Sequence, residues 1–191
     1  MELYVARHGE TEFNLERRIQ GSGKDSPLTQ KGIDQARALG KSLDGISFDA
    51  VYSSPSKRAT DTVAIAFGGK HTPILDPRLK EIGMGAMEGM VWEDAAELYP
   101  KSTNSLINPL NHTPPPGGEA LQDMVDRVSA FMDDMAKTGH RRVFVLTHSY
   151  TLRVFQACTQ DKPLEAIPKT RGFMNCEVTV FKLKNNKWEM Q

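Results

Sequence analysis

The chain has little of several features that would narrow its function. Its 191 residues contain two cysteines, Cys158 and Cys176, which form no C-x-x-C pair and no zinc-ligand spacing, so we expect both to be buried, reduced thiols. The 24 basic and 24 acidic side chains cancel, so no overall positive field would draw nucleic acid or an anionic membrane. Any anion-binding site must therefore be local.

Long apolar stretches are also missing. No run approaches the roughly 20 residues needed to cross a bilayer, and the first strand starts at once without a basic leader. We therefore expect no secretory signal and a cytoplasmic protein. The sequence shows no internal repeat, heptad pattern or low-complexity tract. Its length and its 39% hydrophobic content favour one domain over residues 1–191, with a core that needs no metal or disulfide.

Short apolar runs alternate with amphipathic stretches along the chain. Strands are predicted at residues 3–6, 49–53, 74–75 and 143–146, and a closing hairpin at 178–181 and 188–190 with its turn at 185–186. Helices are predicted at residues 30–43 after an N-cap at Thr29, 56–67 after a cap at Ser54 with Pro55 in its first position, 92–99, 119–137 and 150–159. This alternation predicts an α/β fold, a three-layer α/β/α sandwich with a largely parallel central sheet.

The irregular segment from about residue 83 to 118 is too long for an ordinary connection, and we expect it to be an inserted lid. Its apolar side chains could cover a leaving group or pack into the core, with Met87, Trp92 and Leu106 as the candidate pocket walls. The full apolar set is Met84, Met87, Met90, Val91, Trp92, Leu106, Ile107 and Leu110.

Three basic side chains follow the ends of predicted strands: His8, Arg58 and His148. Parallel strands end at one edge of a sheet, so we expect these side chains to converge there, with Arg7 beside His8. Arg58 falls in the first turn of its helix, where the macrodipole disfavours a cation by up to about 1 kcal/mol, a penalty that a bound anion would remove. Glu81 is a candidate proton donor near the same edge, since a bound phosphate favours the protonated form of a neighbouring carboxyl.

These residues belong to a series of motifs that runs along most of the chain. The motifs are Arg7-His8-Gly9-Glu10-Thr11 with Asn14, Gln20-Gly21, Asp25-Ser26-Pro27-Leu28-Thr29, Ser53-Ser54-Pro55 with Arg58-Ala59 and Thr62, Glu81-Ile82-Gly83 with Glu88-Gly89, Pro116-Gly117-Gly118-Glu119, and Val145-Leu146-Thr147-His148. In this order and spacing the chain resembles the histidine phosphatase superfamily, the phosphoglycerate mutase-like group.

The resemblance implies a role for each site residue. His8 would be the nucleophile that becomes phosphohistidine, and Glu81 the general acid and base. Arg7, Arg58 and His148 would form the phosphate pocket as two guanidinium groups and an imidazolium, which suits phosphoryl transfer because that reaction needs mainly alignment and charge neutralisation. Asn14, Gln20 and Gly21 would line the pocket, and no metal or other cofactor would take part.

Position 149 departs from the pattern of many relatives, which have a glycine directly after the second histidine. The chain has Ser149 there. The backbone amide of Ser149 can still donate a hydrogen bond to phosphate, so we predict Ser149 to be a phosphate-binding residue. The Cβ of Ser149 narrows the approach to the pocket.

The predicted function is that of a histidine acid-type phosphatase, a metal-independent phosphomonoesterase for small phosphorylated metabolites. A mutase-like phosphotransferase is the alternative, although residues 82–118 contain one lysine, Lys101, and no arginine to hold a substrate carboxylate. An inactive phosphate-binding module is a further alternative, which the complete set of core residues disfavours. We expect no nucleic-acid or membrane partner; the substrate and homo-oligomerisation stay open.

Overall fold

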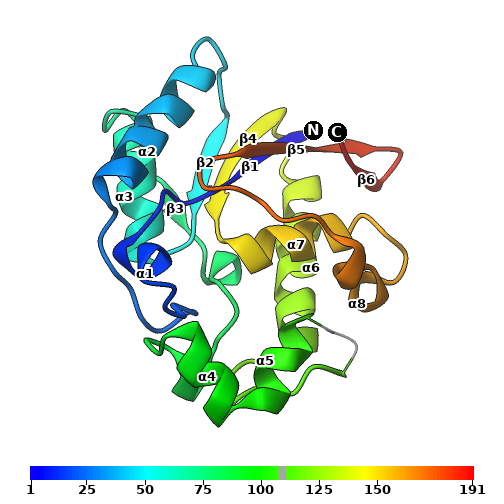
Figure 1. Cartoon of the computed structure of the whole chain (residues 1–191). Helices are drawn as coiled ribbons and strands as arrows, with labels where there is room; N and C mark the ends of the chain where they lie inside the picture. Colours follow the sequence, from blue (N-terminus) through cyan, green and yellow to red (C-terminus); the bar gives the residue numbers. More distant parts are fainter. Residues whose placement is uncertain (108–110) are drawn as a thin grey trace.

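A twisted sheet runs through the centre of the computed structural model, which describes residues 1–107 and 111–191 (Figure 1). Within these residues six strands pair in the order β3-β2-β4-β1-β5-β6. Their bounds are β1 Glu2–Arg7, β2 Ala50–Ser53, β3 Ile74–Leu75, β4 Arg142–Thr147, β5 Val178–Lys184 and β6 Lys187–Met190. The first four are parallel to one another, and β5 and β6 join as an antiparallel hairpin. The largely parallel sheet is confirmed.

The middle residues of the two central strands, β1 and β4, are mostly apolar because helices cover both faces of the sheet. Val143 and Val145 of β4 pack into one core cluster with side chains of α6 (Leu121–Lys137) and α7 (Ser149–Ala157). Phe144 and Leu146 point the other way, into a cluster with side chains of α2 (Gln30–Ser42) and α3 (Lys57–Ala66). This alternation is the two-residue period of a strand, and it confirms the three-layer sandwich.

All five predicted helices are present, but α3 and α6 each start later than expected. The bounds of the other helices are α1 Glu12–Leu15, α2 Gln30–Ser42, α3 Lys57–Ala66, α4 Trp92–Leu98, α5 Pro100–Ile107 and α8 Pro163–Ala166. Thr29 caps α2 by accepting a hydrogen bond from the Gly32 N–H at 3.0 Å, as predicted. Ser54 does not cap α3, which begins two residues later than expected, after Ser56. The Ser54 hydroxyl is bonded to His148 and Ser56 instead.

The segment from 83 to 118 contains more helix than expected. Besides α4, which was predicted, it holds α5, and both lie at the end of the molecule below the sheet in the view of Figure 1. The buried side of α5 is formed by the small hydroxyl residues Ser102, Thr103 and Ser105, so the sequence shows no apolar helical period there. Leu110 and the side chain of Ile107, two of the candidate lid residues, lie outside what the structure describes.

The two cysteines are free, and both are only partly buried, which corrects the expectation of fully buried thiols. Burial still raises the pKa of both thiols, to about 12 for Cys176. Across the described ranges, no helix is both long and apolar enough to cross a membrane.

Candidate active site

Two histidines and an arginine meet where three neighbouring strands end. His8 follows β1, His148 follows β4, and Arg58 lies in the first turn of α3, just after β2. The imidazole rings of His8 and His148 are 5.2 Å apart in an edge-on arrangement. Arg58 bridges them, with Nε 3.3 Å from His8 Nε2 and Nη2 3.1 Å from His148 Nδ1. The predicted convergence of these three side chains is therefore present.

Arg58 is 1% exposed and is anchored from outside its own helix. Its guanidinium donates to the carbonyl oxygens of Gly21 at 2.8 Å and Lys24 at 3.1 Å, and it pairs with the Asp25 carboxylate at 3.0 Å. The second Asp25 oxygen also accepts the Arg58 backbone N–H at 3.4 Å. The cation at this helix N-terminus is thus compensated by Asp25, whereas the sequence suggested that a bound anion was needed.

His8 is buried and has a defined tautomer. Its Nδ1 lies 2.7 Å from the Gly9 carbonyl oxygen, which can only accept, so Nδ1 carries the proton and Nε2 keeps its lone pair. Burial, and then the charges of Arg58 and Arg7, hold the pKa of His8 well below its usual value near 6.5. The imidazole is therefore neutral and nucleophilic at Nε2.

His148 is fully buried behind Arg58. Its Nδ1 accepts from Arg58, so its Nε2–H donates to the Ser54 hydroxyl at 2.7 Å. Burial, followed by the charge of Arg58, holds the pKa of His148 well below the usual value. These surroundings favour a neutral His148 that orients Arg58, whereas the resemblance implies an imidazolium at this position.

A cavity of about 700 Å³ opens in front of these groups. Of the residues predicted for the site, those that line it are Arg7, His8, Asn14, Gln20, Gly21, Arg58, Glu81 and Ser149. His148 is not among its lining residues. Met84, Trp92 and Leu106 line it from the segment 83–118, whereas Met87 is fully buried in the core, so the prediction of Met87 as a pocket wall is wrong.

Glu81 is held at the cavity by the N-terminus of α7. Its carboxylate accepts from the backbone N–H groups of Tyr150 and Thr151, each at 3.1 Å. Arg127 of α6 fixes the chain around it by donating to the carbonyl oxygens of Lys80 at 2.8 Å and Glu81 at 3.3 Å. Because the first N–H groups of a helix have no partner within the helix, the Glu81 carboxylate acts here as their cap.

Several cavity residues were missed by the sequence analysis. They are Glu10, Arg17, Arg18, Ile19, Tyr150, Arg153 and Asn175. Asn175 donates from Nδ2 to the His8 carbonyl oxygen at 2.8 Å across a separation of 167 residues, and no local pattern indicates such a contact. Arg153 follows Ser149 by one helical turn, so the helical period of α7 could have indicated it. The arginines also show that counting basic residues in the segment 82–118 alone underestimates the positive charge of the cavity.

Glu88 is another residue whose role the sequence analysis missed. Its carboxylate connects two loops beside the cavity. Its Oε1 accepts from the backbone N–H groups of Ser22 and Met84, each at 3.0 Å. It thereby ties the loop that presents Gln20 and Gly21 to the segment after Glu81. The motif containing Glu88 was noticed in the sequence, but the contact depends on the fold.

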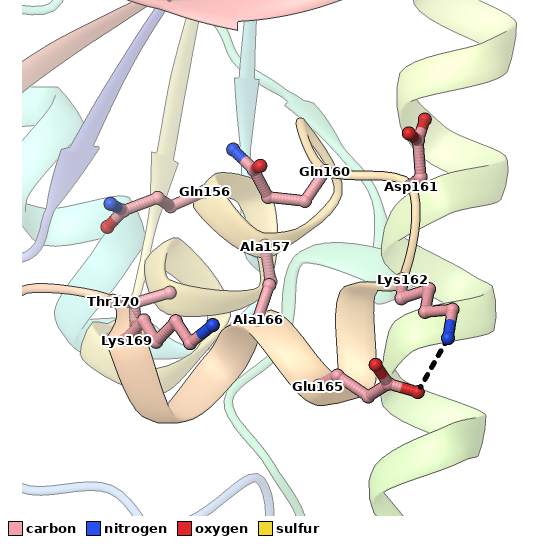
Figure 2. Close-up of a pocket in the computed structure, with 9 residues that line it drawn as sticks. All are labelled: Gln156, Ala157, Gln160, Asp161, Lys162, Glu165, Ala166, Lys169 and Thr170. Atoms are coloured by element: carbon pink, nitrogen blue, oxygen red, sulfur yellow. Dashed lines mark ion pairs between the residues drawn. The ribbon is translucent and has the colours of Figure 1, made fainter.

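A second cavity, of about 500 Å³, lies between the end of α7 and α8 (Figure 2). In Figure 2 the side chains of Lys162 and Glu165 point toward one another, and their ion pair is 3.4 Å long. No histidine lines this cavity, and it is separate from the cluster around His8. Elsewhere in residues 1–107 and 111–191, no group of three or more His, Cys, Asp or Glu side chains could hold a metal ion.

Taken together, the sandwich fold and the buried pair of His8 and Arg58 define an α/β protein with a cationic pocket at the carboxyl edge of its sheet. The comparison with protein families agrees, since the model of the histidine phosphatase superfamily (branch 1) matches residues 3–191. The chain belongs to this superfamily.

Individual relatives carry different activities in their names. The chain is 31% identical to the probable phosphoglycerate mutase GpmB of Salmonella choleraesuis (strain SC-B67), over 98% of this chain and 87% of that protein. Among solved structures it is similar to Bacillus stearothermophilus YhfR, with 32% identity and a TM-score of 0.90 over 99% of this chain and 94% of that one. It is also similar to the alpha-ribazole phosphatase of Shigella flexneri, with 25% identity and a TM-score of 0.89 over 100% and 95% of the two chains. The names of these relatives therefore include both a mutase and a phosphatase.

Proposed function

We propose that the protein is a metal-independent phosphomonoesterase that hydrolyses small phosphorylated metabolites through a phosphohistidine on His8. The observation that carries this proposal is the state of His8: a neutral imidazole whose Nε2 lone pair lies against Arg58 at the wall of a 700 Å³ cavity. Such a group is a nucleophile ready to attack phosphorus, and the neighbouring guanidinium is a ready partner for the phosphoryl oxygens.

In the first half of the reaction, His8 Nε2 attacks the phosphorus in line with the departing oxygen. The P–N bond forms, the P–O ester bond breaks, and Glu81 protonates the leaving oxygen. Arg58 and Arg7 neutralise the equatorial oxygens. Support for Arg7 comes from its Nε, which is buried and has no hydrogen-bond partner among the described residues.

In the second half, a water molecule takes the place of the leaving group. Glu81 removes a proton from this water, the oxygen attacks phosphorus, and the P–N bond breaks to release inorganic phosphate and restore neutral His8. Asn14, Gln20, Gly21 and the Ser149 amide complete the pocket in this proposal, and His148 keeps Arg58 in place.

The proposal also assigns a role to the segment 83–118. Residues 1–191 act as one catalytic domain, and this segment forms the lid over the leaving group. Met84, Trp92 and Leu106 support this assignment because they line the cavity from the segment. Adaptable apolar walls of this kind accept leaving groups of several shapes.

A mutase-like phosphotransferase is the second candidate. Two observations favour it: relatives at 31% identity are named probable phosphoglycerate mutases, and Arg17, Arg18 and Arg153 add positive charge to the cavity. In such an enzyme the phosphohistidine would pass its phosphoryl group to a second hydroxyl instead of to water.

The test is to trap the intermediate. Wild type is mixed with a ³²P-labelled phosphomonoester in the presence of EDTA and quenched in base, in which phosphohistidine survives. We expect label on the wild type and on Glu81→Gln, none on His8→Ala, and undiminished label on His71→Ala, whose imidazole is exposed away from the cavity. Under the same conditions, wild type should release phosphate from p-nitrophenyl phosphate in the steady state, and His8→Ala should release none.

The alternatives give different results. Rapid interconversion of 2- and 3-phosphoglycerate after priming with a bisphosphate, with little release of phosphate, would replace the phosphatase by the mutase. Binding of phosphate without label or turnover would identify a phosphate-binding module and overturn both catalytic proposals.

A further inference from the structure

The wall of the cavity formed by α7 carries a second polar feature beyond the phosphoryl pocket. Tyr150 and Arg153 lie three residues apart on this helix, so they share one face of it, and both line the cavity. The Arg153 guanidinium lies over the Tyr150 ring at 6.0 Å from its centroid. The two side chains therefore form one surface patch, which we call the Tyr150–Arg153 patch.

Arg153 differs from the other arginines at the rim of the cavity in its lack of a partner. Arg17 is paired with Glu93 at 2.7 Å, and Arg18 with Glu16 at 2.6 Å. Within residues 1–107 and 111–191, Arg153 has neither an ion pair nor a hydrogen bond, and its neighbours are the Tyr150 ring and the backbone at Gly172. Its charge is therefore free to meet a ligand.

The Tyr150 hydroxyl is also unused. It is buried, and among the described residues it has no hydrogen-bond partner. Burial raises the pKa of Tyr150 to about 12, so the phenol keeps its proton and can donate it in a hydrogen bond. A buried donor without an acceptor costs free energy, which an acceptor group on a ligand would recover.

The position of the patch relative to Glu81 indicates which part of a substrate it faces. The Glu81 carboxylate is bonded to the Tyr150 N–H, and in the proposed mechanism it lies beside the leaving oxygen. Arg153 lies three residues further along the helix, about 4.5 Å along its axis. A group two or three bonds beyond the ester oxygen would therefore come close to this guanidinium.

We propose that Arg153, assisted by the Tyr150 hydroxyl, is a specificity-determining residue that binds a carboxylate on the leaving group of the substrate. This inference rests on the proposed phosphatase function and adds to it the chemical class of the preferred substrate, a phosphorylated carboxylic acid. One guanidinium fork and one phenol match the single charge and two oxygens of a carboxylate. A second phosphate carries up to two charges and three oxygens, which would need more cations than this patch supplies.

The experiment uses two substrates that differ only in this group, 3-phosphonooxypropanoate and 3-hydroxypropyl phosphate. For wild type we expect kcat/KM to be higher for the carboxylate by about 10- to 100-fold, the range of one charge-assisted hydrogen bond to a buried site. Arg153→Gln should bring the ratio close to one, with the larger loss of rate on the carboxylate. Tyr150→Phe should lower the ratio by a smaller factor, and Arg153→Lys should retain part of it.

Two controls separate this role from a structural one. Arg153→Gln should lose much less rate on p-nitrophenyl phosphate, which has no carboxylate, than on 3-phosphonooxypropanoate. Arg37→Gln, an exposed arginine of α2, should leave every ratio unchanged. An equal loss on all substrates, or a wild-type ratio near one, would overturn the assignment of Arg153.

A binding measurement keeps this result distinct from a failure of the proposed function. Calorimetric Kd values for the same two compounds are measured with His8→Ala, in which no phosphohistidine can form, with and without Arg153→Gln. A preference for the carboxylate that disappears with Arg153→Gln would support the patch even if wild type had no phosphatase activity. Equal Kd values for the two compounds would refute it whatever the turnover.

Discussion

At the scale of single residues, Arg58 connects the parts of the site. One guanidinium contacts both histidines, two backbone carbonyls and Asp25, and it is almost completely buried. A lysine would keep the charge but offers a single ammonium in place of the planar fork. The geometry of Arg58, more than its charge, is therefore what the site depends on.

We expect Arg58→Lys to lower kcat/KM for p-nitrophenyl phosphate by about 10²- to 10³-fold, the usual cost of removing a donor aimed at the transition state. The free energy of unfolding should fall by about 2–3 kcal/mol, because Asp25 and His148 lose buried partners. Steady-state kinetics and urea unfolding measure the two effects. Arg37→Lys, an exposed arginine paired with Asp34, is the matched control and should change neither quantity. Activity within fivefold of wild type would show that the fork is dispensable.

At the scale of elements, the N-terminus of α7 joins Glu81 to the site. The carboxylate caps this helix through Tyr150 and Thr151, so a loss of Glu81 has both a structural and a chemical consequence. The amide oxygen of glutamine can still accept one of these two hydrogen bonds, but a glutamine cannot donate and recover a proton. Glu81→Gln therefore removes the acid–base chemistry and keeps part of the cap.

Glu81→Gln should lower kcat/KM for an alkyl phosphate by about 10²- to 10⁴-fold, the range of general acid catalysis, because its leaving alkoxide needs a proton. The loss should be much smaller with p-nitrophenyl phosphate, whose leaving group departs as a stable anion. Comparison of the two substrates in one assay measures this difference, and the melting temperature checks that α7 is intact. Equal losses on both substrates would mean that Glu81 acts only by positioning the helix.

The helix α2 touches the site through a close backbone approach. A Cβ added to Gly32 would overlap the carbonyl oxygen of Glu10, two residues after His8, and one added to Gly40 would overlap that of Ala66 at the end of α3. Both positions are in the same helix, where alanine is intrinsically better than glycine by about 1 kcal/mol. The two positions differ in the backbone that a Cβ would displace. At Gly32 it belongs to the loop that carries His8, and at Gly40 it belongs to the end of α3.

We expect Gly32→Ala and Gly40→Ala both to lower the free energy of unfolding, since the overlap with rigid backbone outweighs the gain in helix propensity. Only Gly32→Ala should also reduce kcat/KM, by about tenfold or more, because a shift of the loop misaligns His8. Urea unfolding and kinetics on the two variants test this pair. A comparable loss of activity in Gly40→Ala would show that activity follows overall stability instead of the position of the loop.

At the scale of the whole molecule, the sequence predicted those elements that have a periodic pattern of apolar residues or a short turn motif. The parallel strands, the amphipathic helix α6 and the hairpin turn at 185–186, whose two asparagines have positive φ, all follow from short patterns. The short helices α1 and α8 were missed, because four residues are too few to show a period. The helix α5 was missed because its buried side is formed by small hydroxyl groups.

The same distinction between local and distant contacts decides which residues of the site could be predicted from the sequence. Residues next to a strand end or within a motif, such as His8 and Arg58, could be found in the sequence. Asn175 becomes a cavity residue only because the chain after α7 folds back onto β1, and contacts of this kind depend on packing between segments distant in sequence. The neutral state of His148 likewise results from burial, which the order of residues does not reveal.

The two buried histidines also make the stability of the whole molecule depend on pH. Burial and the nearby arginines lower the pKa of His8 and His148 in the folded state, whereas in the unfolded chain both titrate near 6.5. Below pH 6.5 the unfolded chain binds protons that the folded protein does not, so stability is full above this pH and is lost as the pH falls. The half-buried His112, whose pKa burial also lowers, contributes in the same sense.

We expect the free energy of unfolding of wild type to fall between pH 6.5 and pH 5 by up to about 1.4 kcal/mol per pH unit for each of the two histidines. Carboxylates with a lowered pKa, such as Glu2, take effect only below about pH 4.5, so this interval isolates the histidines. Urea unfolding at several pH values measures the slope, and His8→Asn and His148→Gln should each reduce it whatever their own stability, with His112 supplying the remainder. A wild type as stable at pH 5 as at pH 7 would mean that His8 and His148 become protonated within the folded protein, and His8 would then lack the lone pair that the proposed attack on phosphorus requires.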